Sequence, residues 1–323
     1  MRDHGGDLDR AMAVHGGAAE SWIDLSTGIN ARPYPPPPLP GRAWTALPTR
    51  AETARLAEAA RAAYAARASV VPLAGAQAAI QLIPRLAPLG RAHVLGPTYN
   101  EHAAALRAAG WQVEERTSLD ALAGADLAVV VNPNNPDGAR HAPRALADLS
   151  ARVGLLVVDE SFADAAPELS CAPALDPLDR RLVVLRSFGK FYGLAGLRLG
   201  FAVAGEALAA RLQDMAGPWA VGGPAIAVGA AALGDRTWQA ATLRRLQADA
   251  ERLDALAAQA GWTLVGGTPL FRTYETGDAA AAQDRLAAAR IWTRAFPYSG
   301  GWLRLGLPGA EAHWTRLQAA LLA

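Results

Sequence analysis

The sequence predicts an α/β fold in which a mostly parallel sheet lies between helices and is followed by a smaller α+β domain. Short apolar runs without polar alternation recur along residues 69–203, and helix-like segments separate several of them. Such runs are typical of strands that are buried on both faces, as in parallel sheets. Beyond Gly217 two long helices precede a group of strands, so the order of the elements changes there. A chain of 323 residues is also long enough to divide into two domains.

We expect the main sheet to form from six apolar runs that are bounded by Gly, Pro, Asn or Asp. These runs are residues 69–73, 92–95, 127–131, 155–158, 182–185 and 199–203. The helix-like segments around them are residues 49–68, with Thr49 as N-cap, and residues 76–86, 100–109, 143–152 and 205–215. Together these elements predict a large domain over residues 41–216.

The ends of the chain predict a second domain. Residues 33–40 are rich in proline, which favours an extended arm or linker, so residues 1–40 are expected to form an N-terminal arm that joins the small domain. The small domain is expected over residues 217–323. Its predicted elements are helices 224–233 and 237–260, strands 262–265 and 269–274, helix 279–289, strands 291–296 and 301–305, and helix 311–322.

The charge balance excludes several classes of protein. Lys and Arg number 31 against 30 Asp and Glu, whereas proteins that bind nucleic acid or membrane surfaces usually carry a basic excess. The single cysteine, Cys171, excludes a disulfide framework and a multi-cysteine metal site, and no H-E-x-x-H motif is present, so no metal is expected. No signal segment or transmembrane run is visible, which predicts a cytoplasmic protein.

One basic residue differs from all the others. Thirty of the 31 basic residues are Arg, and Lys190 is the only Lys. A composition bias that replaces Lys by Arg could have left Lys190 by chance. Alternatively, Lys190 has a role that Arg cannot fill, namely to lose its proton and act as an amine nucleophile. The count alone leaves both interpretations open.

Polar side chains follow three of the predicted strands. Asn135 lies in the segment after residues 127–131, Asp159 ends the next strand, and Lys190 follows the strand at 182–185. Taken singly, the Asn-rich segment is also a good turn and Asp159 a good cap. Ligands of open parallel sheets bind beyond the carboxyl ends of the strands, so together these residues predict a site where Lys190 forms a Schiff base.

A second set of residues suits a phosphate group. Gly75, Ala76 and Gln77 join a strand to a helix, where small residues leave backbone N–H groups open to an anion. Ser187 and Arg198 could add a hydroxyl and a guanidinium to the same anion. Since the glycines after Lys190 do not form G-x-G-x-x-G, a dinucleotide site is not expected. A phosphate cradle beside a reactive lysine and a carboxylate predicts pyridoxal 5′-phosphate as cofactor.

The motifs around Lys190 carry a resemblance to a known family. Ser187-x-x-Lys190-x-x-Gly193-Leu194-x-Gly196-x-Arg198-x-Gly200, after Asn135-Pro136-x-Gly138 and Asp159-Glu160-x-Phe162, resembles the fold-type-I aminotransferases of the aspartate and histidinol-phosphate branches. The match runs in order over most of the chain. It implies a pyridoxal-phosphate transferase fold with a mostly parallel seven-stranded sheet. It also implies a homodimer with active sites at the subunit interface.

The resemblance also implies the role of each site residue. Lys190 forms the Schiff base and moves protons at the α-carbon of the substrate, and Asp159 pairs with the pyridinium nitrogen. Asn135 donates to the phenolic oxygen and Tyr99 stacks on the ring. The phosphate is held by Gly75, Ala76, Gln77, Ser187 and Arg198, and Arg304 binds the substrate carboxylate.

The N-terminal segment separates decarboxylation from transamination. Asp3-His4-Gly5-Gly6 and residues 22–30 resemble the L-threonine O-3-phosphate decarboxylase family of cobalamin biosynthesis, whose product is (R)-1-amino-2-propanol O-2-phosphate. The resemblance implies a small phosphorylated amino acid as substrate. Its implied ligands are His4, Gly28, Asn30, Arg32, Asn135 and Arg304. The alternatives are an aminotransferase of the histidinol-phosphate type and a cofactor-binding regulatory protein that has lost catalysis.

Overall fold

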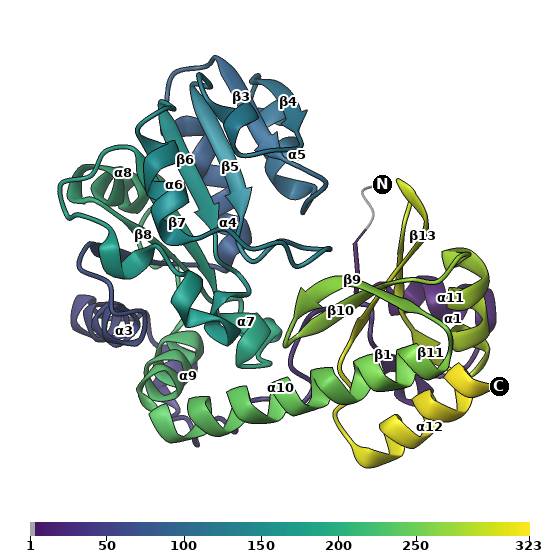
Figure 1. Cartoon of the computed structure of the whole chain (residues 1–323). Coiled ribbons are helices and arrows are strands. Elements are labelled where there is room, and N and C mark those ends of the chain that lie inside the picture. Colours follow the sequence, from purple (N-terminus) through teal and green to yellow (C-terminus); the bar gives the residue numbers. More distant parts are fainter. Residues whose placement is uncertain (1–3) are drawn as a thin grey trace. The chain divides into compact units, whose positions relative to one another are not determined.

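The computed structural model describes residues 4–323, which form two compact units (Figure 1). The large unit comprises Tyr34–Asn135 and Arg140–Trp238. The small unit comprises the described residues up to Pro33, the short segment Pro136–Ala139, and Gln239–Ala323. Each unit therefore contains segments that are far apart in the sequence.

A seven-stranded sheet forms the centre of the large unit. Its strands lie in the order β2-β8-β7-β6-β5-β3-β4, with the four pairings from β7 to β4 parallel and both pairings of β8 antiparallel. The strands are β2 (Ser69–Leu73), β3 (Arg91–Leu95), β4 (Gln112–Arg116), β5 (Leu127–Val131), β6 (Leu155–Asp159), β7 (Leu182–Ser187) and β8 (Gly200–Ala204). The predicted fold class, a mostly parallel sheet of the fold-type-I kind, is confirmed.

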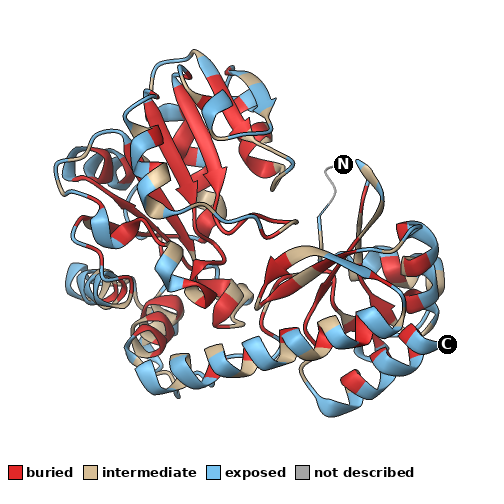
Figure 2. Cartoon of the chain, viewed as in Figure 1, coloured by how far each residue is buried: buried red, intermediate tan, exposed pale blue. Residues whose placement is uncertain are grey.

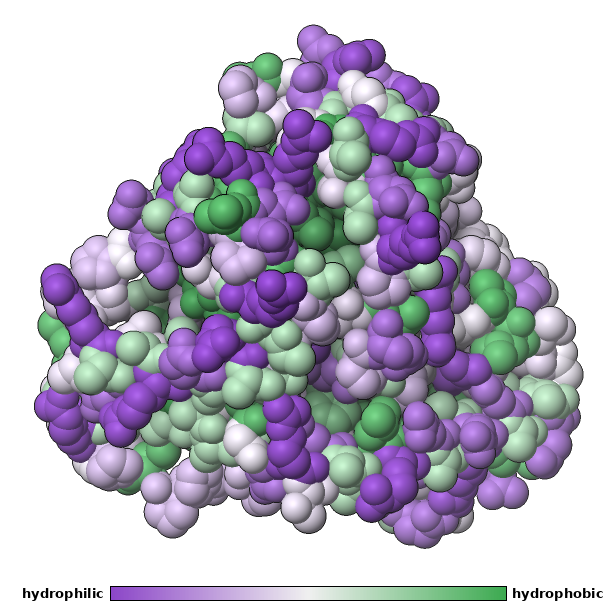
Figure 3. All heavy atoms as spheres, turned by 60° about the vertical axis from the view of Figure 1, so that its left-hand side comes forward, coloured by the Kyte–Doolittle hydropathy of each residue, from purple (hydrophilic) through white to green (hydrophobic). Residues whose placement is uncertain are grey.

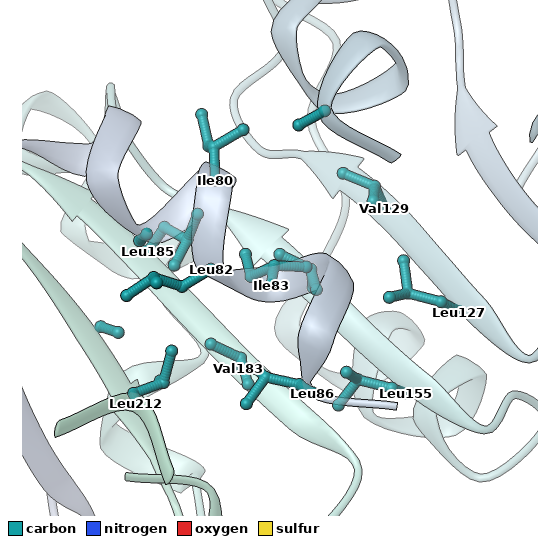
Figure 4. Close-up of a cluster of buried hydrophobic side chains, with 14 of the residues drawn as sticks. Ile80, Leu82, Ile83, Leu86, Leu127, Val129, Leu155, Val183, Leu185 and Leu212 are labelled. Atoms are coloured by element: carbon teal, nitrogen blue, oxygen red, sulfur yellow. The ribbon is translucent and has the colours of Figure 1, made fainter. Parts of the chain in front are cut away.

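Helices cover the sheet and bury its central strands. The helices of the large unit are α2 (Arg42–Thr45), α3 (Arg50–Ala63), α4 (Ala76–Leu82), α5 (Glu101–Ala108), α6 (Pro143–Ser150), α7 (Phe188–Phe191), α8 (Glu206–Ala216) and α9 (Gly223–Gly234). Every residue of β5 is buried, as is every residue of β6 (Figure 2). On one face, Ile80 and Ile83 of α4 and the turn after it pack with Leu127 and Leu185 of the sheet and Leu212 of α8 (Figure 4).

The small unit is built on a four-stranded antiparallel sheet in the order β12-β13-β10-β9. A separate parallel pair joins β1 near the N-terminus to β11 near the C-terminus. The strands are β1 (Ile23–Asp24), β9 (Thr263–Thr268), β10 (Phe271–Glu275), β11 (Ile291–Trp292), β12 (Arg294–Phe296) and β13 (Ser299–Gly306). The helices are α1 (Leu8–His15), α10 (Arg236–Gln259, which begins in the large unit), α11 (Ala279–Ala288) and α12 (Glu311–Leu322).

Several elements differ from the sequence-based expectation for identifiable reasons. The edge strand β4 was not expected because its sequence, Gln-Val-Glu-Glu-Arg, lacks an apolar run. The single strand expected at residues 291–296 is two strands, since β11 pairs with β1 and β12 pairs with β13. The helix expected at 49–68 ends at Ala63, because Ala65 adopts a left-handed conformation with φ 48°. Its predicted N-cap is confirmed: the Thr49 hydroxyl accepts from the Glu52 amide at 3.2 Å.

The boundaries of the two compact units differ from the expected domain boundaries, which are 40/41 and 216/217. Residues 217–238 lie in the large unit because α9 packs along α3 and α2. Gly229 of α9 makes this approach close, since a Cβ there would lie 3.0 Å from Leu56 of α3. At the other end, Tyr34 lies in the large unit, where its amide donates to the Tyr192 carbonyl at 2.8 Å.

No helix between residues 4 and 323 is both long enough and apolar enough to cross a bilayer. On the face shown in Figure 3, hydrophilic side chains lie among the hydrophobic ones.

A buried ion cluster fixes the ends of β6 and β7. Arg186 of β7 donates to Glu160 at 2.8 Å and to Asp164 at 2.7 Å, and its guanidinium lies 4.2 Å from the centroid of the Tyr64 ring. Glu160 also accepts from the Ser170 hydroxyl at 2.5 Å. Because Arg186 and Glu160 are almost wholly buried, each charge offsets the cost of removing the other from water.

We expect Arg186→Met to lower the free energy of unfolding by about 3–5 kcal/mol, because two buried carboxylates lose their cation. Chemical denaturation followed by circular dichroism measures this loss. Arg152→Met is the matched control, since Arg152 pairs with Asp120 at the surface and its removal should change stability little. Equal losses in the two variants would contradict a structural role for the buried cluster.

Candidate active site

A cavity of about 150 Å³ lies beyond the carboxyl ends of β5, β6 and β7. Asn135 follows β5, Asp159 ends β6, and Lys190 follows β7, as the parallel order of these strands requires. All nine residues that the sequence suggested for the cofactor line this cavity, namely Gly75, Ala76, Gln77, Tyr99, Asn135, Asp159, Ser187, Lys190 and Arg198. All of them belong to the large unit.

Lys190 lies in α7, one turn of helix directly after β7. Phe188 packs face to face on Tyr192, with ring centroids 4.4 Å apart, so aromatic contacts hold this turn in place. Gly189 allows the turn to touch the segment that follows, since a Cβ there would lie 2.7 Å from the Ala195 Cα. The Lys190 amine lies 5.7 Å from the centroid of the Phe162 ring, at one wall of the cavity.

Asp159 is a buried carboxylate with three hydrogen-bond donors. Its Oδ2 lies 2.8 Å from His102 Nε2, and its Oδ1 accepts from the Ser161 amide at 2.9 Å and the Ser161 hydroxyl at 2.5 Å. Burial acts to raise the pKa of Asp159, but the hydrogen bonds from His102 and Ser161 and the charge of His102 outweigh it and hold that pKa below its ordinary value. Asp159 is therefore a fixed negative charge at the floor of the cavity.

Another part of the cavity lining is built from close backbone contacts. Gly75 precedes α4 with φ 81°, a conformation that favours glycine, and a Cβ there would lie 3.1 Å from Arg198 Nη2. Gly200 of β8 lies against the same turn, since its Cβ would meet the Ala76 nitrogen at 2.4 Å. The first amides of α4 and the Arg198 guanidinium thus border one part of the cavity, where they suit an anion.

The loop that carries Asn135 is held by its neighbouring asparagines. The Asn132 amide group donates to the His141 carbonyl at 3.0 Å and accepts from the His141 amide at 2.9 Å, which closes the loop at its base. Asn134 donates to the Pro97 carbonyl at 3.0 Å and accepts from the Thr98 hydroxyl at 2.6 Å. These bonds tie the loop to the segment that carries Tyr99. The side chains of Asn135 and Tyr99 therefore reach the cavity from backbone segments that are held together.

The other suggested substrate ligands, His4, Gly28, Asn30, Arg32 and Arg304, all lie in the small unit. Arg304 of β13 is buried, donates to the Ser26 carbonyl, and lies 5.3 Å from the centroid of the Phe271 ring. The Asn30 oxygen accepts from the Arg32 amide at 3.0 Å and from Arg245 at 2.9 Å. Gly28 is buried, whereas His4 and Arg32 are exposed.

Three residues near these sets were not expected from the sequence. His102 and Glu101 begin α5, where a polar helix start gives no sign that both side chains are buried. Glu101 accepts from Gln77 at 3.0 Å, and Gln77 accepts from the Tyr99 hydroxyl at 3.4 Å. Arg294 lies opposite Arg304 in the β12–β13 pair, and both guanidiniums lie over Phe296, at 5.1 and 6.0 Å from its centroid. Only the cross-strand register reveals this arginine pair.

We expect His102→Phe to destabilise the protein by roughly 1–3 kcal/mol at pH 7, because a buried carboxylate loses one of its hydrogen-bond donors. In the wild type the pKa of Asp159 is lowered on folding, so its contribution is present above the unfolded pKa of about 3.9 and is lost as pH falls through the lower folded pKa. Without His102, burial raises the folded pKa, so protonation at low pH stabilises the variant. The stability difference between the two proteins should therefore shrink from pH 7 to pH 4, as urea denaturation at each pH would measure.

A difference that stays constant between these two pH values would contradict this account of Asp159. His313→Phe serves as the control, since His313 lies in the small unit at the start of α12 and should show no such pH-dependent difference.

Comparisons with known proteins agree with this geometry. A family model described as aminotransferase class I and II matches residues 45–320. The chain is 47% identical to a threonine-phosphate decarboxylase of Sinorhizobium sp over 98% of this chain and 97% of that protein. It is 44% identical to a threonine-phosphate decarboxylase of Pseudomonas aeruginosa over 100% of this chain and 98% of that protein.

The fold is also similar to a solved structure, the histidinol-phosphate aminotransferase of Sinorhizobium meliloti in complex with pyridoxal 5′-phosphate. The TM-score is 0.81 at 20% identity, over 97% of this chain and 93% of that one. Because the family model covers most of the chain and both relatives match over nearly their full length, the chain belongs to the aminotransferase class I and II family.

Proposed function

We propose that this protein decarboxylates L-threonine O-3-phosphate to (R)-1-amino-2-propanol O-2-phosphate in cobalamin biosynthesis. The two relatives similar over their full length are named threonine-phosphate decarboxylases. The observation that carries the proposal is the position of Lys190. The only lysine of the chain lies at a cavity that also contains a buried carboxylate and an anion cradle.

The residues of the cavity fit pyridoxal 5′-phosphate, the cofactor of this family. The amine of Lys190 can form a Schiff base with the cofactor aldehyde. The carboxylate of Asp159 can pair with a protonated nitrogen of the cofactor ring. The space that a Cβ on Gly75 would fill borders the Arg198 guanidinium, which suits the cofactor phosphate together with Ser187 and the first amides of α4. Tyr99 would stack on the face of the ring, and Asn135 would donate a hydrogen bond to its phenolic oxygen.

Each residue then has a definite task. When bound, pyridoxal phosphate supplies a conjugated ring that accepts the electron pair of the α-carbon bond standing perpendicular to it. Asp159 keeps its negative charge across the working pH range, because its pKa is held low, and so holds a proton on the ring nitrogen. Lys190 is the amine that binds the cofactor and returns a proton to the α-carbon after the carboxylate has left.

The small unit supplies the groups that suit an anionic substrate. Threonine phosphate carries a carboxylate and a phosphate, and Arg304 and Arg294 present two guanidiniums from neighbouring strands. The family resemblance also implies His4, Gly28 and Arg32 of the small unit as substrate ligands, and it implies Asn135 in the large unit. Asn30 has a supporting role in this account, because its side-chain oxygen accepts from both Arg32 and Arg245.

The proposal includes a cytoplasmic homodimer. Three large apolar side chains of the large unit, Trp44, Leu47 and Trp219, are 69%, 63% and 58% exposed. An apolar cavity of about 340 Å³ is lined by Leu47 and Ile226 of the same unit. Exposed apolar area of this kind is typical of surfaces that a second subunit covers.

Incubation of the purified enzyme with L-threonine O-3-phosphate alone should release carbon dioxide over many turnovers, without any added keto acid. The absorbance spectrum of the cofactor should return to its starting form after the substrate is consumed. Conversion of the cofactor to its amine form without gas would instead identify an aminotransferase of the histidinol-phosphate type. No turnover with any amino acid would identify a protein that binds the cofactor without catalysis.

Lys190→Arg should lower kcat by about 10³-fold or more, because Arg keeps the positive charge but cannot act as an amine nucleophile or pass a proton. Steady-state carbon dioxide release measures the loss. Arg181→Lys, at an exposed position before β7, is the control and should retain wild-type activity. Activity of Lys190→Arg within tenfold of the wild type would contradict the role of Lys190.

A further inference from the structure

Ser26 joins the N-terminal segment to Arg304 within the small unit. Its hydroxyl accepts from the Gly6 amide at 2.7 Å and donates to Asp24 Oδ1 at 2.6 Å, and its own amide donates to the same oxygen at 2.9 Å. Its carbonyl accepts from Arg304 Nη2. Ser26 is only 1% exposed and Arg304 only 3%, so water competes little for these bonds.

Asp24 fixes which way the Ser26 hydroxyl points. A hydroxyl has one proton to donate, and here it goes to the carboxylate. The lone pairs are then directed at the Gly6 amide, which places the backbone of the N-terminal segment at one position. Ser26 is thus a built acceptor for that segment and not simply a surface serine.

Gly5 shows how closely the segment approaches. A Cβ on Gly5 would lie 2.2 Å from the Ser26 carbonyl oxygen and 3.4 Å from Arg304 Nη2. The first of these neighbours is backbone and cannot rotate away. Any other residue at position 5 would therefore push the segment off Ser26, although the backbone of Gly5 itself needs no special conformation.

We propose that Ser26 and Asp24 are positioning residues that hold Gly5 and Gly6 against Arg304 and thereby give the enzyme its preference for phosphorylated over unphosphorylated amino acids. The inference rests on the proposed function. If Arg304 binds the substrate carboxylate, a group on the β-carbon lies beside that guanidinium. The docked segment borders the same guanidinium, since a Cβ on Gly5 would lie 3.4 Å from Arg304 Nη2. Docking thus fixes Gly5, whose amide N–H suits a phosphate, and the chain that leads to His4, whereas the Gly6 amide is used in the bond to Ser26.

Ser26→Ala separates this role from that of Arg304. The variant loses the acceptor for Gly6 but keeps the backbone carbonyl that Arg304 contacts. The KM for L-threonine O-3-phosphate should rise about tenfold, the order expected for one buried hydrogen bond, with kcat changed less than about twofold. The Kd for unphosphorylated L-threonine, measured by calorimetry, should stay unchanged.

Three further variants and a control make the test more specific. Asp24→Asn keeps an oxygen that can accept from Ser26, so it should stay close to the wild type, whereas Asp24→Ala should behave like Ser26→Ala. Gly5→Ala should also behave like Ser26→Ala because of its contact with the Ser26 carbonyl. Gly41→Ala, where a Cβ meets nothing within 4 Å, is the control for a glycine substitution.

Hydrogen–deuterium exchange of the N-terminal peptide provides a readout without substrate. Exchange across residues 4–7 should be slow in the wild type and in Asp24→Asn, and faster in Ser26→Ala and Gly5→Ala. Equal exchange in all variants would overturn the docking. Faster exchange with equal losses of affinity for phosphorylated and unphosphorylated threonine would overturn the role in selectivity.

If the wild type releases no carbon dioxide, the proposed function fails, but this inference is still tested. The exchange measurement needs no turnover. The ratio of the Kd for L-threonine O-3-phosphate to the Kd for L-threonine then replaces the KM. An unchanged ratio in Ser26→Ala would overturn the inference under that outcome as well.

Discussion

Successive residues of a β-strand point to opposite faces of the sheet, and the active site of this protein depends on that alternation. Asp159 and Ser187 line the cofactor cavity, whereas their neighbours Glu160 and Arg186 pair with each other away from it. The buried ion pair therefore joins the ends of β6 and β7 beside the residues that we propose hold the cofactor.

The remaining contacts of the large unit build on this anchor. Lys190 is held one turn beyond β7 by stacked aromatic rings, and Asp159 is kept ionised by His102 and Ser161. Glycines at positions 75 and 200 let α4 and β8 approach closely, which brings the first amides of α4 beside Arg198. A single amine, a permanent carboxylate and an anion cradle are thereby fixed around one small volume.

The small unit is organised by contacts between backbone segments. Three segments that are far apart in the sequence meet at Ser26 and Arg304. They are the N-terminal glycines, the segment after β1, and the strand β13. Because this meeting depends on backbone contacts, it tolerates few side chains at position 5.

Much of this arrangement could be predicted from the sequence. Buried strands are marked by uninterrupted apolar runs, so β2 and β5 appear with their full bounds, and the motif around Lys190 identifies the residues at the cavity. Three features could not be predicted. The polar edge strand β4 has no hydrophobic signal, and nothing in the sequence around His102 indicates that it is buried beside Asp159. The docking of Gly6 on Ser26 depends on a contact between residues twenty positions apart.

The central claim is that the cofactor is bound covalently by Lys190. Reduction of the purified protein with borohydride, followed by peptide mass spectrometry, tests this directly. Since the chain has one lysine, the account predicts that the cofactor mass is found on the peptide that contains Lys190 and on no other. A cofactor fixed elsewhere, for instance at the N-terminal amine, or no covalent attachment at all, would contradict the account.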